Sequence, residues 1–303
     1  MSRLLLLGTG TPAPLVHRAG SSYLLQTGEQ TLLIDCGPGS VRRLLEAGIQ
    51  TTDIDALLLT HLHYDHCVDY GYLALTRWDQ GIGQVDELQV IGPAPVQHMT
   101  DRLFATDGVY GPDLAARTQH PGSHFIYECR GGAMPRTPPT PVAREVAHGD
   151  TISGSGWRLD VAEVVHVQPQ LTCLAYRIET AEGETIVFGG DTAPTAALTD
   201  LSRDADVLLH MCHFINGAIE DPRLTSCCSG HLDAAHTAAD AGVKTLVLVH
   251  LTEMMETPGV RERLLGEIAQ IFAGQVIFSE DLLDVPLGQI LGEDHLASKD
   301  LSD

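Results

Sequence analysis

Positive charge is scarce in this sequence, and so are long apolar runs. Its 303 residues carry 18 Lys and Arg against 40 Asp and Glu, a formal net charge of −22. Because such a charge opposes the approach of a phosphate backbone, the composition disfavours nucleic acid as a partner. The apolar run at residues 4–7 ends at a Gly-Thr-Gly-Thr-Pro segment, and it is too short for a signal sequence or a bilayer span. We expect a strand there and no membrane partner.

Regularly spaced cysteines are missing as well. The seven cysteines form an odd, irregular set without a CxxC motif, which indicates reduced thiols and a cytoplasmic protein. Cys227 and Cys228 are adjacent, which disfavours a disulfide between them, and the sequence offers them no evident ligand partner. What the chain does have is a composition typical of a packed enzyme, with 44% hydrophobic residues, and fifteen histidines that direct attention to metal-ligand spacing.

Short apolar runs separated by turns predict a sheet-rich domain. Expected strands lie at residues 4–7, 22–26, 31–35, 56–60, 157–165, 173–180, 185–188, 207–209 and 245–249, and expected helices lie near 39–47, 94–104, 195–202 and 234–241. Because strands precede helices in both halves, we expect two similar layers packed sheet on sheet. We interpret residues 1–290 as one domain, residues 92–150 as a Gly- and Pro-rich insertion or lid within it, and residues 291–303 as a polar tail.

Four potential metal ligands lie within six residues, directly after the strand expected at 56–60. They are His61, His63, Asp65 and His66. On a tight loop, this spacing can direct two imidazoles at one metal ion while the next carboxylate and imidazole face a second. Histidines also gather on surface loops by chance, but four candidates in so short a segment favour metal binding.

Three further candidates each stand at the carboxyl end of an expected strand. They are His166, Asp191 and His250. Because such strand ends meet at one edge of an α/β sheet, we expect all seven side chains in one place. Taken singly, a histidine at a strand end is more often a hydrogen-bonded core residue, and Asp191 could begin a helix. The placement of the whole set argues for a metal site.

These residues resemble the metallo-β-lactamase superfamily, whose HxHxDH signature stands here at residues 61–66 and whose later His, Asp and His follow in the same order. The resemblance implies an α/β fold, a four-layer αββα sandwich with two metal ions between its sheets. It implies that the first ion is held by His61, His63 and His166, the second by Asp65, His66 and His250, and that Asp191 bridges both. Such ligands suit Zn²⁺ best, although Mn²⁺ or Fe²⁺ would accept them.

Within the superfamily, the glycine-rich start of the chain resembles the ribonuclease Z and arylsulfatase-like branch. The segments concerned are Leu7-Gly8-Thr9-Gly10-Thr11-Pro12, Arg18-Ala19-Gly20-Ser21-Ser22 and Leu33-Ile34-Asp35-Cys36-Gly37. Ribonuclease Z itself usually carries a long tRNA-binding arm between the ligand histidine and the bridging aspartate, whereas His166 and Asp191 lie 25 residues apart. With the acidic charge, this favours a small-molecule ester, a phosphodiester or an aryl sulfate. Cleavage of tRNA at its 3′ end, or of a lactone or thioester, is the alternative.

The expected chemistry is hydrolysis by a dinuclear zinc enzyme. Two ions bridged by Asp191 and a water would lower the pKa of that water towards about 7 and supply hydroxide as the nucleophile. Asp65 and His231 are the candidate catalytic residues. By resemblance, His231 stands just before a helix, where related enzymes place a catalytic histidine, and it either protonates the leaving group or is an ordinary loop residue. Dimers are common in the family, so a homodimer is possible.

Several other side chains have two interpretations. Asp35 either orients a ligand imidazole or belongs to the turn before Gly37. His210 and His213 flank another strand end and could line the pocket. Three arginines of the insertion either meet an anionic substrate or are solvated surface charge, and these are Arg130, Arg136 and Arg144.

Overall fold

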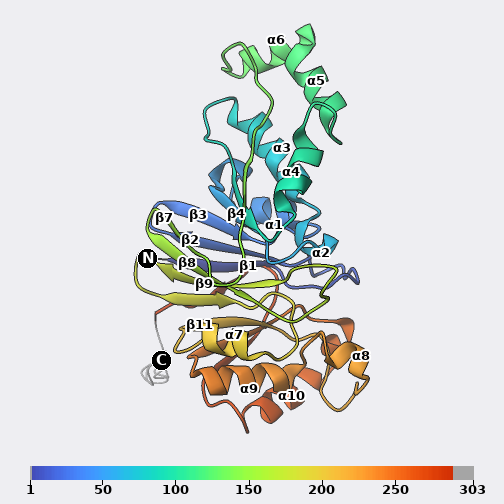
Figure 1. Cartoon of the computed structure of the whole chain (residues 1–303), viewed down its shortest axis with the longest axis vertical. Coiled ribbons are helices and arrows are strands. Elements are labelled where there is room, and N and C mark those ends of the chain that lie inside the picture. Colours follow the sequence, from blue (N-terminus) through green and yellow to red (C-terminus); the bar gives the residue numbers. More distant parts are fainter. Residues whose placement is uncertain (1, 289–303) are drawn as a thin grey trace, which may run out of the picture.

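The computed structural model describes residues 2–288, which form two mixed sheets of seven strands each (Figure 1). The first sheet has the spatial order β14 (Leu283–Val285), β1 (Arg3–Gly8), β2 (Ser22–Thr27), β3 (Gln30–Ile34), β4 (Ala56–Leu58), β5 (Gln89–Gly92) and β6 (Val142–Glu145). The second has the order β13 (Gln275–Phe278), β12 (Thr245–Val249), β11 (Val207–Met211), β10 (Thr185–Phe188), β9 (Leu174–Thr180), β8 (Trp157–Glu163) and β7 (Thr151–Gly154). Parallel pairing runs from β3 to β6 and from β10 to β13.

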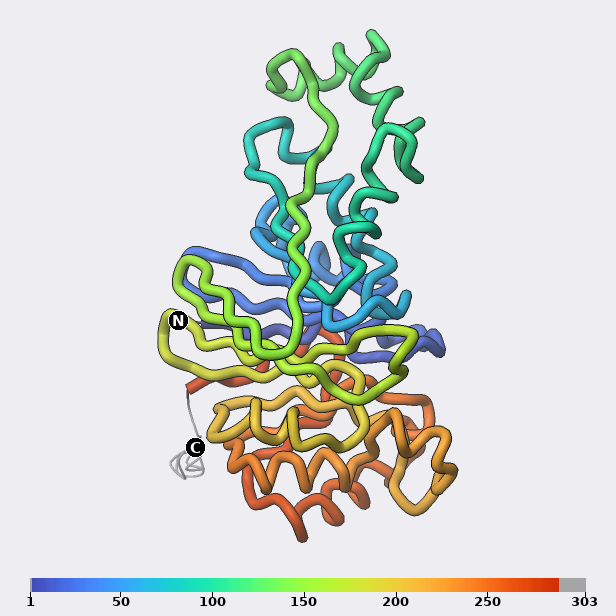
Figure 2. The backbone as a smooth tube through the Cα atoms, viewed as in Figure 1, coloured from blue at the N-terminus to red at the C-terminus, as the bar shows by residue number. Residues whose placement is uncertain are grey.

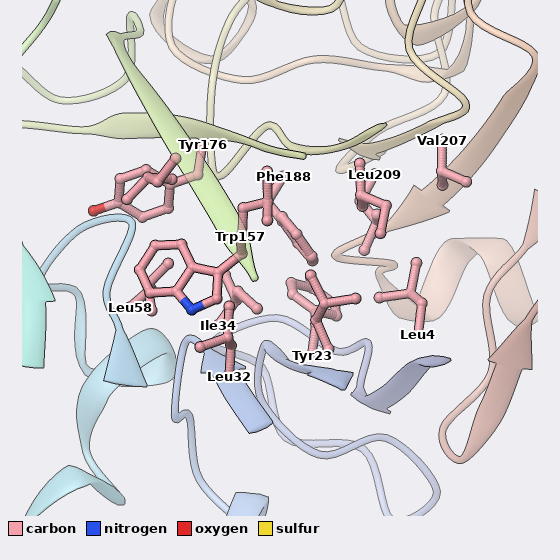
Figure 3. Close-up of a cluster of buried hydrophobic side chains, with 14 of the residues drawn as sticks. Leu4, Tyr23, Leu32, Ile34, Leu58, Trp157, Tyr176, Phe188, Val207 and Leu209 are labelled. Atoms are coloured by element: carbon pink, nitrogen blue, oxygen red, sulfur yellow. The ribbon is translucent and has the colours of Figure 1, made fainter. Parts of the chain in front are cut away.

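The two sheets pack face to face around one hydrophobic core. Figure 3 shows Tyr23 and Ile34 of the first sheet meeting Trp157 and Phe188 of the second. Successive side chains of a strand point to opposite faces. In β1, Leu4 and the other even-numbered leucine therefore enter this core, while the odd-numbered leucines pack under helices. Because both faces of the strand are covered, its sequence is a run of leucines rather than an alternation of polar and apolar residues.

Helices cover the outer face of each sheet. The first sheet is covered by α1 (Ser40–Glu46), α3 (Tyr70–Gly81) and α4 (Val96–Phe104). The second is covered by α7 (Ala196–Leu201), α9 (His231–Ala241) and α10 (Val260–Ile268). Short helical turns lie in the loops: α2 (Tyr64–Cys67), α8 (Pro222–Thr225), η1 (Thr51–Asp53) and η2 (Glu253–Glu256). The expected four-layer αββα sandwich is confirmed.

The stretch expected as an insertion contains more regular structure than the sequence suggested. Its first helix, α4, and its last strand, β6, belong to the sandwich, and between them lie α5 (Gly111–Gln119) and α6 (Pro121–Cys129). Figure 2 shows this pair projecting from the end of the molecule opposite the second sheet. Pro112 and Pro121 lie within the first two positions of these helices. A proline there begins a helix instead of breaking it, so the Gly- and Pro-rich pattern was misleading.

Two of the three arginines in this stretch pair with a carboxylate instead of facing solvent freely. The guanidinium of Arg136 lies over the rings of Trp78 and Tyr127, and its Nη2 lies 2.6 Å from an oxygen of Asp79. Arg130 also pairs with Asp79 at 3.0 Å, while Arg144 is exposed on β6. The interpretation of these arginines as surface charge therefore holds only for Arg144.

Two further expectations concern the carboxyl-terminal tail and a membrane span. The expected polar tail at residues 291–303 lies outside the described residues. Within residues 2–288, no helix has the length and the apolar character needed to cross a bilayer.

Candidate metal centre

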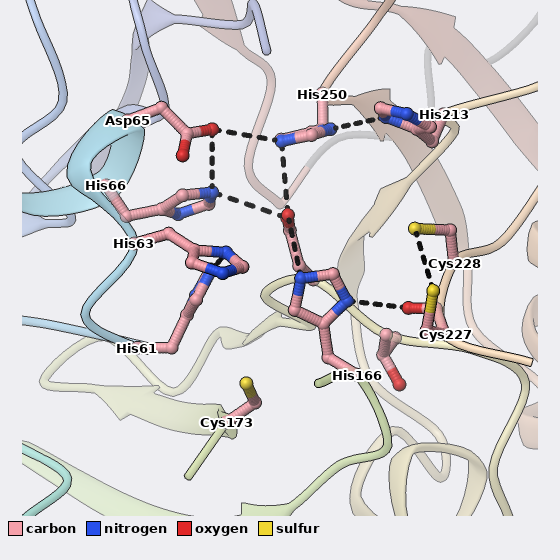
Figure 4. Close-up of polar contacts among 12 residues, drawn as sticks. His61, His63, Asp65, His66, His166, Cys173, His213, Cys227, Cys228 and His250 are labelled. Atoms are coloured by element: carbon pink, nitrogen blue, oxygen red, sulfur yellow. Dashed lines mark hydrogen bonds and ion pairs between the residues drawn. The ribbon is translucent and has the colours of Figure 1, made fainter. Parts of the chain in front are cut away.

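The structure brings all seven predicted ligands together where strand ends of the two sheets meet (Figure 4). The first sheet supplies His61 and His63 from the loop after β4, followed by Asp65 and His66 in α2. The second sheet supplies its three residues just beyond β8, β10 and β12, and these are His166, Asp191 and His250. The rule that strand ends converge therefore predicted the grouping correctly across two sheets.

The donor atoms form two groups. Those of the first group lie within 4.8 Å of one another and come from His61, His63, His166 and Asp191. Those of the second group are equally close and come from Asp65, His66 and His250. The carboxylate of Asp191 lies between the groups, because its oxygens are 3.8 Å from Nε2 of His166, 3.4 Å from Nε2 of His66 and 3.1 Å from Nε2 of His250.

Two buried polar atoms at the centre lack the partners that buried polar atoms normally have. Nε2 of His66 and Oδ1 of Asp65 are both enclosed, and neither forms a hydrogen bond with any residue from 2 to 288. Nε2 of His66 has only longer ion-pair contacts, at 3.4 Å with Asp191 and at 3.5 Å with Asp65. A buried donor or acceptor without a partner is costly, and a divalent cation would satisfy both atoms. The cluster therefore has the donor chemistry and the vacant contacts of a divalent metal site.

The charges of the cluster also suit a cation. Burial, reinforced by the neighbouring His66, lowers the pKa of His61 well below its ordinary value. This imidazole is therefore neutral at neutral pH and offers a lone pair. Burial on its own would raise the pKa of Asp191, but His250 and His66 outweigh it and hold that pKa well below the ordinary range. The carboxylate between the two groups is thus ionised.

Most ligand histidines are held from behind. In four of them, Nδ1 contacts a protein group outside the proposed ligand set, while Nε2 points to the centre. His61 contacts Oγ1 of Thr60 at 3.1 Å, and His66 contacts Asp35 at 2.8 Å. His166 contacts the carbonyl of Cys227 at 2.6 Å, and His250 contacts Nδ1 of His213 at 3.2 Å. Such outer partners fix the orientation of a ligand ring and the nitrogen that it presents to a metal. His213, which the sequence left as a pocket-lining candidate, therefore supports a ligand.

Of the two interpretations of Asp35, the contact with His66 favours the one in which Asp35 orients an imidazole of the cluster. Besides His66, its carboxylate accepts hydrogen bonds from the backbone and the hydroxyl of Thr60. Asp35 and His250 both have a positive φ, 58° and 57°. Non-glycine residues seldom adopt this conformation, and where it occurs it is held by surrounding contacts, often at functional sites.

Glycines of the amino-terminal motifs allow close backbone packing against the segment at residues 61–66, which carries four of the proposed ligands. A Cβ added to Gly37 would lie 1.9 Å from the carbonyl oxygen of Asp65, and one on Gly20 would lie 2.8 Å from the same atom. One on Gly8 would lie 1.9 Å from the carbonyl oxygen of Gly20. These three glycines let separate loops stack directly under Asp65. The GxG of the motif is therefore a packing feature of this site.

His231 lies in a different environment from the one the sequence suggested. It is the first residue of α9 and is fully buried. Its Nε2 lies 2.7 Å from a carboxylate oxygen of Glu267 in α10, and its Nδ1 accepts a hydrogen bond from the backbone of Asn216. Neither contact joins it to the cluster. Asp233 is the third residue of this helix and accepts a hydrogen bond from the N–H of Gly230.

Comparison with known proteins places this geometry in a family. Residues 16–250 match the family model of the metallo-beta-lactamase superfamily. The chain is 34% identical over 288 residues to a protein named Ribonuclease Z from Mycolicibacterium paratuberculosis, covering 93% of this chain and 97% of that protein. A Ribonuclease Z from Mycobacterium avium is 33% identical with the same coverage.

Solved structures share the fold. The metallo-beta-lactamase fold protein YhfI from Bacillus subtilis superposes with a TM-score of 0.70 at 22% identity, over 94% of this chain and all of that one. The short form of human tRNase Z gives a TM-score of 0.66 at 17% identity, over 95% of this chain and all of that one. With two sheets, flanking helices and the His and Asp cluster at their seam, the chain is a metal-dependent hydrolase that belongs to the metallo-beta-lactamase superfamily.

Proposed function

We propose that this hydrolase cleaves a phosphodiester bond of RNA, as a tRNA 3′-processing endonuclease of the ribonuclease Z type. The observation that carries the proposal is the nearly end-to-end similarity to relatives named Ribonuclease Z. The proposal reverses the order of the functions inferred from the sequence, where this activity was the alternative to cleavage of a small ester.

In the proposed site, His61, His63 and His166 would hold one Zn²⁺, and Asp65, His66 and His250 would hold a second, with Asp191 as a further ligand. When bound, such a pair of cations supplies an activated water and neutralises the charge that develops on a substrate phosphate. The chain's own part is orientation. Asp35, Thr60, His213 and the Cys227 carbonyl fix four imidazoles from behind, so that the donor atoms are arranged before a cation or substrate arrives.

The substrate is expected to enter from the side of His63 and His166, because these are the only ligands of the seven that are not fully buried. Tyr64, the next residue after His63, exposes 58% of its surface there, and its hydroxyl donates to the carbonyl of Pro12 at 3.0 Å. An aromatic ring held in this way offers a flat face to an unpaired base.

A small phosphodiester or aryl sulfate is the second candidate substrate, and two observations favour it. The formal net charge is −22. Only residues 164–173 connect β8 to β9, so no RNA-binding arm extends between His166 and Asp191. A long RNA would therefore need other contacts or a basic partner.

One assay separates the two substrates. Zinc-loaded protein is given a precursor tRNA with a 3′ trailer, bis(p-nitrophenyl) phosphate and p-nitrophenyl sulfate in parallel, with Asp191→Ala as the inactive control. We expect cleavage at the 3′ end of the tRNA moiety, and a KM for RNA that rises in Tyr64→Ala while the KM for the chromogenic diester does not change. Turnover of a small ester with intact precursor tRNA would select the second candidate.

A further inference from the structure

The two adjacent cysteines, which had no evident partner in the sequence, lie beside one of the metal-ligand histidines. Donor atoms of Cys227, Cys228 and His166 are all within 4.8 Å of one another. The sulfur atoms of the two cysteines are 3.8 Å apart. Figure 4 shows both thiols on the side of the His166 ring that faces Cys227. The fold thus joins two thiols and an imidazole that are 61 residues apart in the chain.

The spacing of the sulfurs fits chelation better than a disulfide. Two thiolates bound at about 2.3 Å to a tetrahedral Zn²⁺ are about 3.8 Å apart, and the sulfurs have this separation already. A larger thiophilic ion needs only a few tenths of an ångström more. A disulfide between neighbouring residues would instead need them to approach to about 2 Å with a distorted backbone. Cys227 is half-buried and Cys228 is buried, so a cation can reach the pair from the Cys227 side.

We propose that Cys227, Cys228 and His166 form a separate binding site for one thiophilic cation, of the class of Cd²⁺ or Cu⁺. Thiolate ligands select soft cations of this kind over hard ones such as Mg²⁺ or Mn²⁺.

This site competes with the first zinc group for His166. In the structure, Nδ1 of His166 donates to the carbonyl of Cys227 at 2.6 Å, and its Nε2 lies 3.8 Å from Asp191. A cation that binds both thiolates and this ring must break the Nδ1 hydrogen bond or draw Nε2 away from Asp191. Either change weakens zinc binding in the first group. A thiophilic cation is therefore an inhibitor, a consequence that rests on the proposed function.

Ultraviolet absorption tests the site without any activity measurement. Protein carrying two equivalents of Zn²⁺ under reducing conditions is titrated with Cd²⁺, and the thiolate-to-Cd²⁺ charge-transfer band is recorded. We expect the band to saturate at one Cd²⁺ per chain. It should disappear in the Cys227→Ser/Cys228→Ser double variant and persist in Cys129→Ser, because Cys129 is an exposed cysteine at the end of α6. Circular dichroism checks that each variant is folded.

Three results would overturn the proposal. They are a band of equal size in the folded double variant, no band in the wild type, and a wild-type mass two units lower in the absence of reductant that the double variant does not show, which would identify the two thiols as a disulfide pair. The inhibition is measured separately. The Cd²⁺ concentration that halves turnover should rise about tenfold or more in the double variant. A thiolate band in a protein without hydrolase activity would support this site and contradict the proposed function instead.

Discussion

Nδ1 of His66 donates a hydrogen bond to Oδ2 of Asp35 over 2.8 Å, and both side chains are buried. Asp35 is fixed in turn by Thr60, which donates to it from its backbone and its hydroxyl. This contact leaves Nε2 as the only ring nitrogen of His66 that is available to the centre. The orientation of His66, a proposed ligand, therefore depends on a carboxylate outside the proposed ligand set.

Replacing Asp35 should weaken metal binding while leaving all proposed ligands in place. An Asn at this position keeps one oxygen and cannot accept from Thr60 and His66 as the carboxylate does. We expect Asp35→Asn to lower zinc affinity about 10- to 100-fold, measured by competition with a chromogenic chelator. Asp69→Asn is the control, because this aspartate accepts from the backbone of Gly39 and not from a ligand. Equal zinc affinity in wild type and folded Asp35→Asn would contradict the supporting role.

A methyl group at Gly37 should displace the backbone of the segment at residues 61–66, which carries four of the proposed ligands. The added Cβ would overlap the carbonyl oxygen of Asp65 at 1.9 Å, and backbone on both sides would have to move. We expect Gly37→Ala to lower the free energy of unfolding by roughly 2 kcal/mol and to reduce bound zinc, measured by urea unfolding and metal analysis.

Gly266 provides the matched control for this change. It lies inside α10, and a Cβ there would meet no atom within 4 Å apart from the backbone of the helix itself. Gly266→Ala should therefore raise the free energy of unfolding by up to about 1 kcal/mol and leave zinc content unchanged. If Gly37→Ala behaves like this control, then Gly37 does not have the close-packing role that the geometry gives it.

His231 should support the fold whether or not it takes part in catalysis. Its ring joins α9 to Glu267 of α10 through a 2.7 Å contact and is fully buried. We expect His231→Ala to lower the free energy of unfolding by about 2 kcal/mol, Glu267→Ala to lower it less, and both to retain zinc. The predicted catalytic role is tested by turnover. A fall in kcat in zinc-saturated His231→Ala, absent from Glu267→Ala, supports that role, and an unchanged kcat in both rules it out.

Asp79 should make a pH-dependent contribution to stability. Burial on its own would raise the pKa of Asp79, but Arg136 and Arg130 outweigh it and hold that pKa below its ordinary value of 3.8. A carboxyl group with a lowered pKa in the folded state stabilises the protein above its unfolded pKa, and this effect is lost as the pH falls through the folded pKa.

Asp79→Asn should therefore destabilise the protein by about 2 kcal/mol at pH 7, and the difference from wild type should shrink as the pH falls below about 4. Urea unfolding at pH 7, 5, 4 and 3 measures it. Asp200→Asn removes a carboxylate that pairs with Arg203 on the exposed surface, so its effect should stay within about 1 kcal/mol. A gap between wild type and Asp79→Asn that does not change with pH would contradict the assignment.

The sequence predicted the cluster because each ligand carries a signal of its own. His166, Asp191 and His250 each follow an apolar strand, and parallel strands bring their carboxyl ends to one edge. The partner of His166 carries no such signal, since it is the backbone carbonyl of Cys227 and any residue type supplies one. The direction of the His231 ring depends on Glu267, which comes from a helix that packs only in the finished fold.

The substrate class was harder to predict for a different reason. Net charge sums the whole surface, and the count of −22 weighed against nucleic acid. The net charge does not say which charged side chains lie near the opening beside His63. The similarity to relatives named Ribonuclease Z, at 34% and 33% identity, is separate evidence and supports the opposite substrate class. Composition is therefore weak evidence about the ligand of one site, whereas strand ends are strong evidence about its position.

The cluster draws His61, His63, Asp65 and His66 from one sheet, and His166, Asp191 and His250 from the other. A cation held there fastens the amino-terminal half of the chain to the carboxyl-terminal half. At a free concentration one thousand times its dissociation constant, such an ion adds about 4 kcal/mol to the free energy of unfolding. Starvation for the bound metal would therefore make the protein easier for proteases to degrade, and the amount of enzyme would follow the supply of that metal.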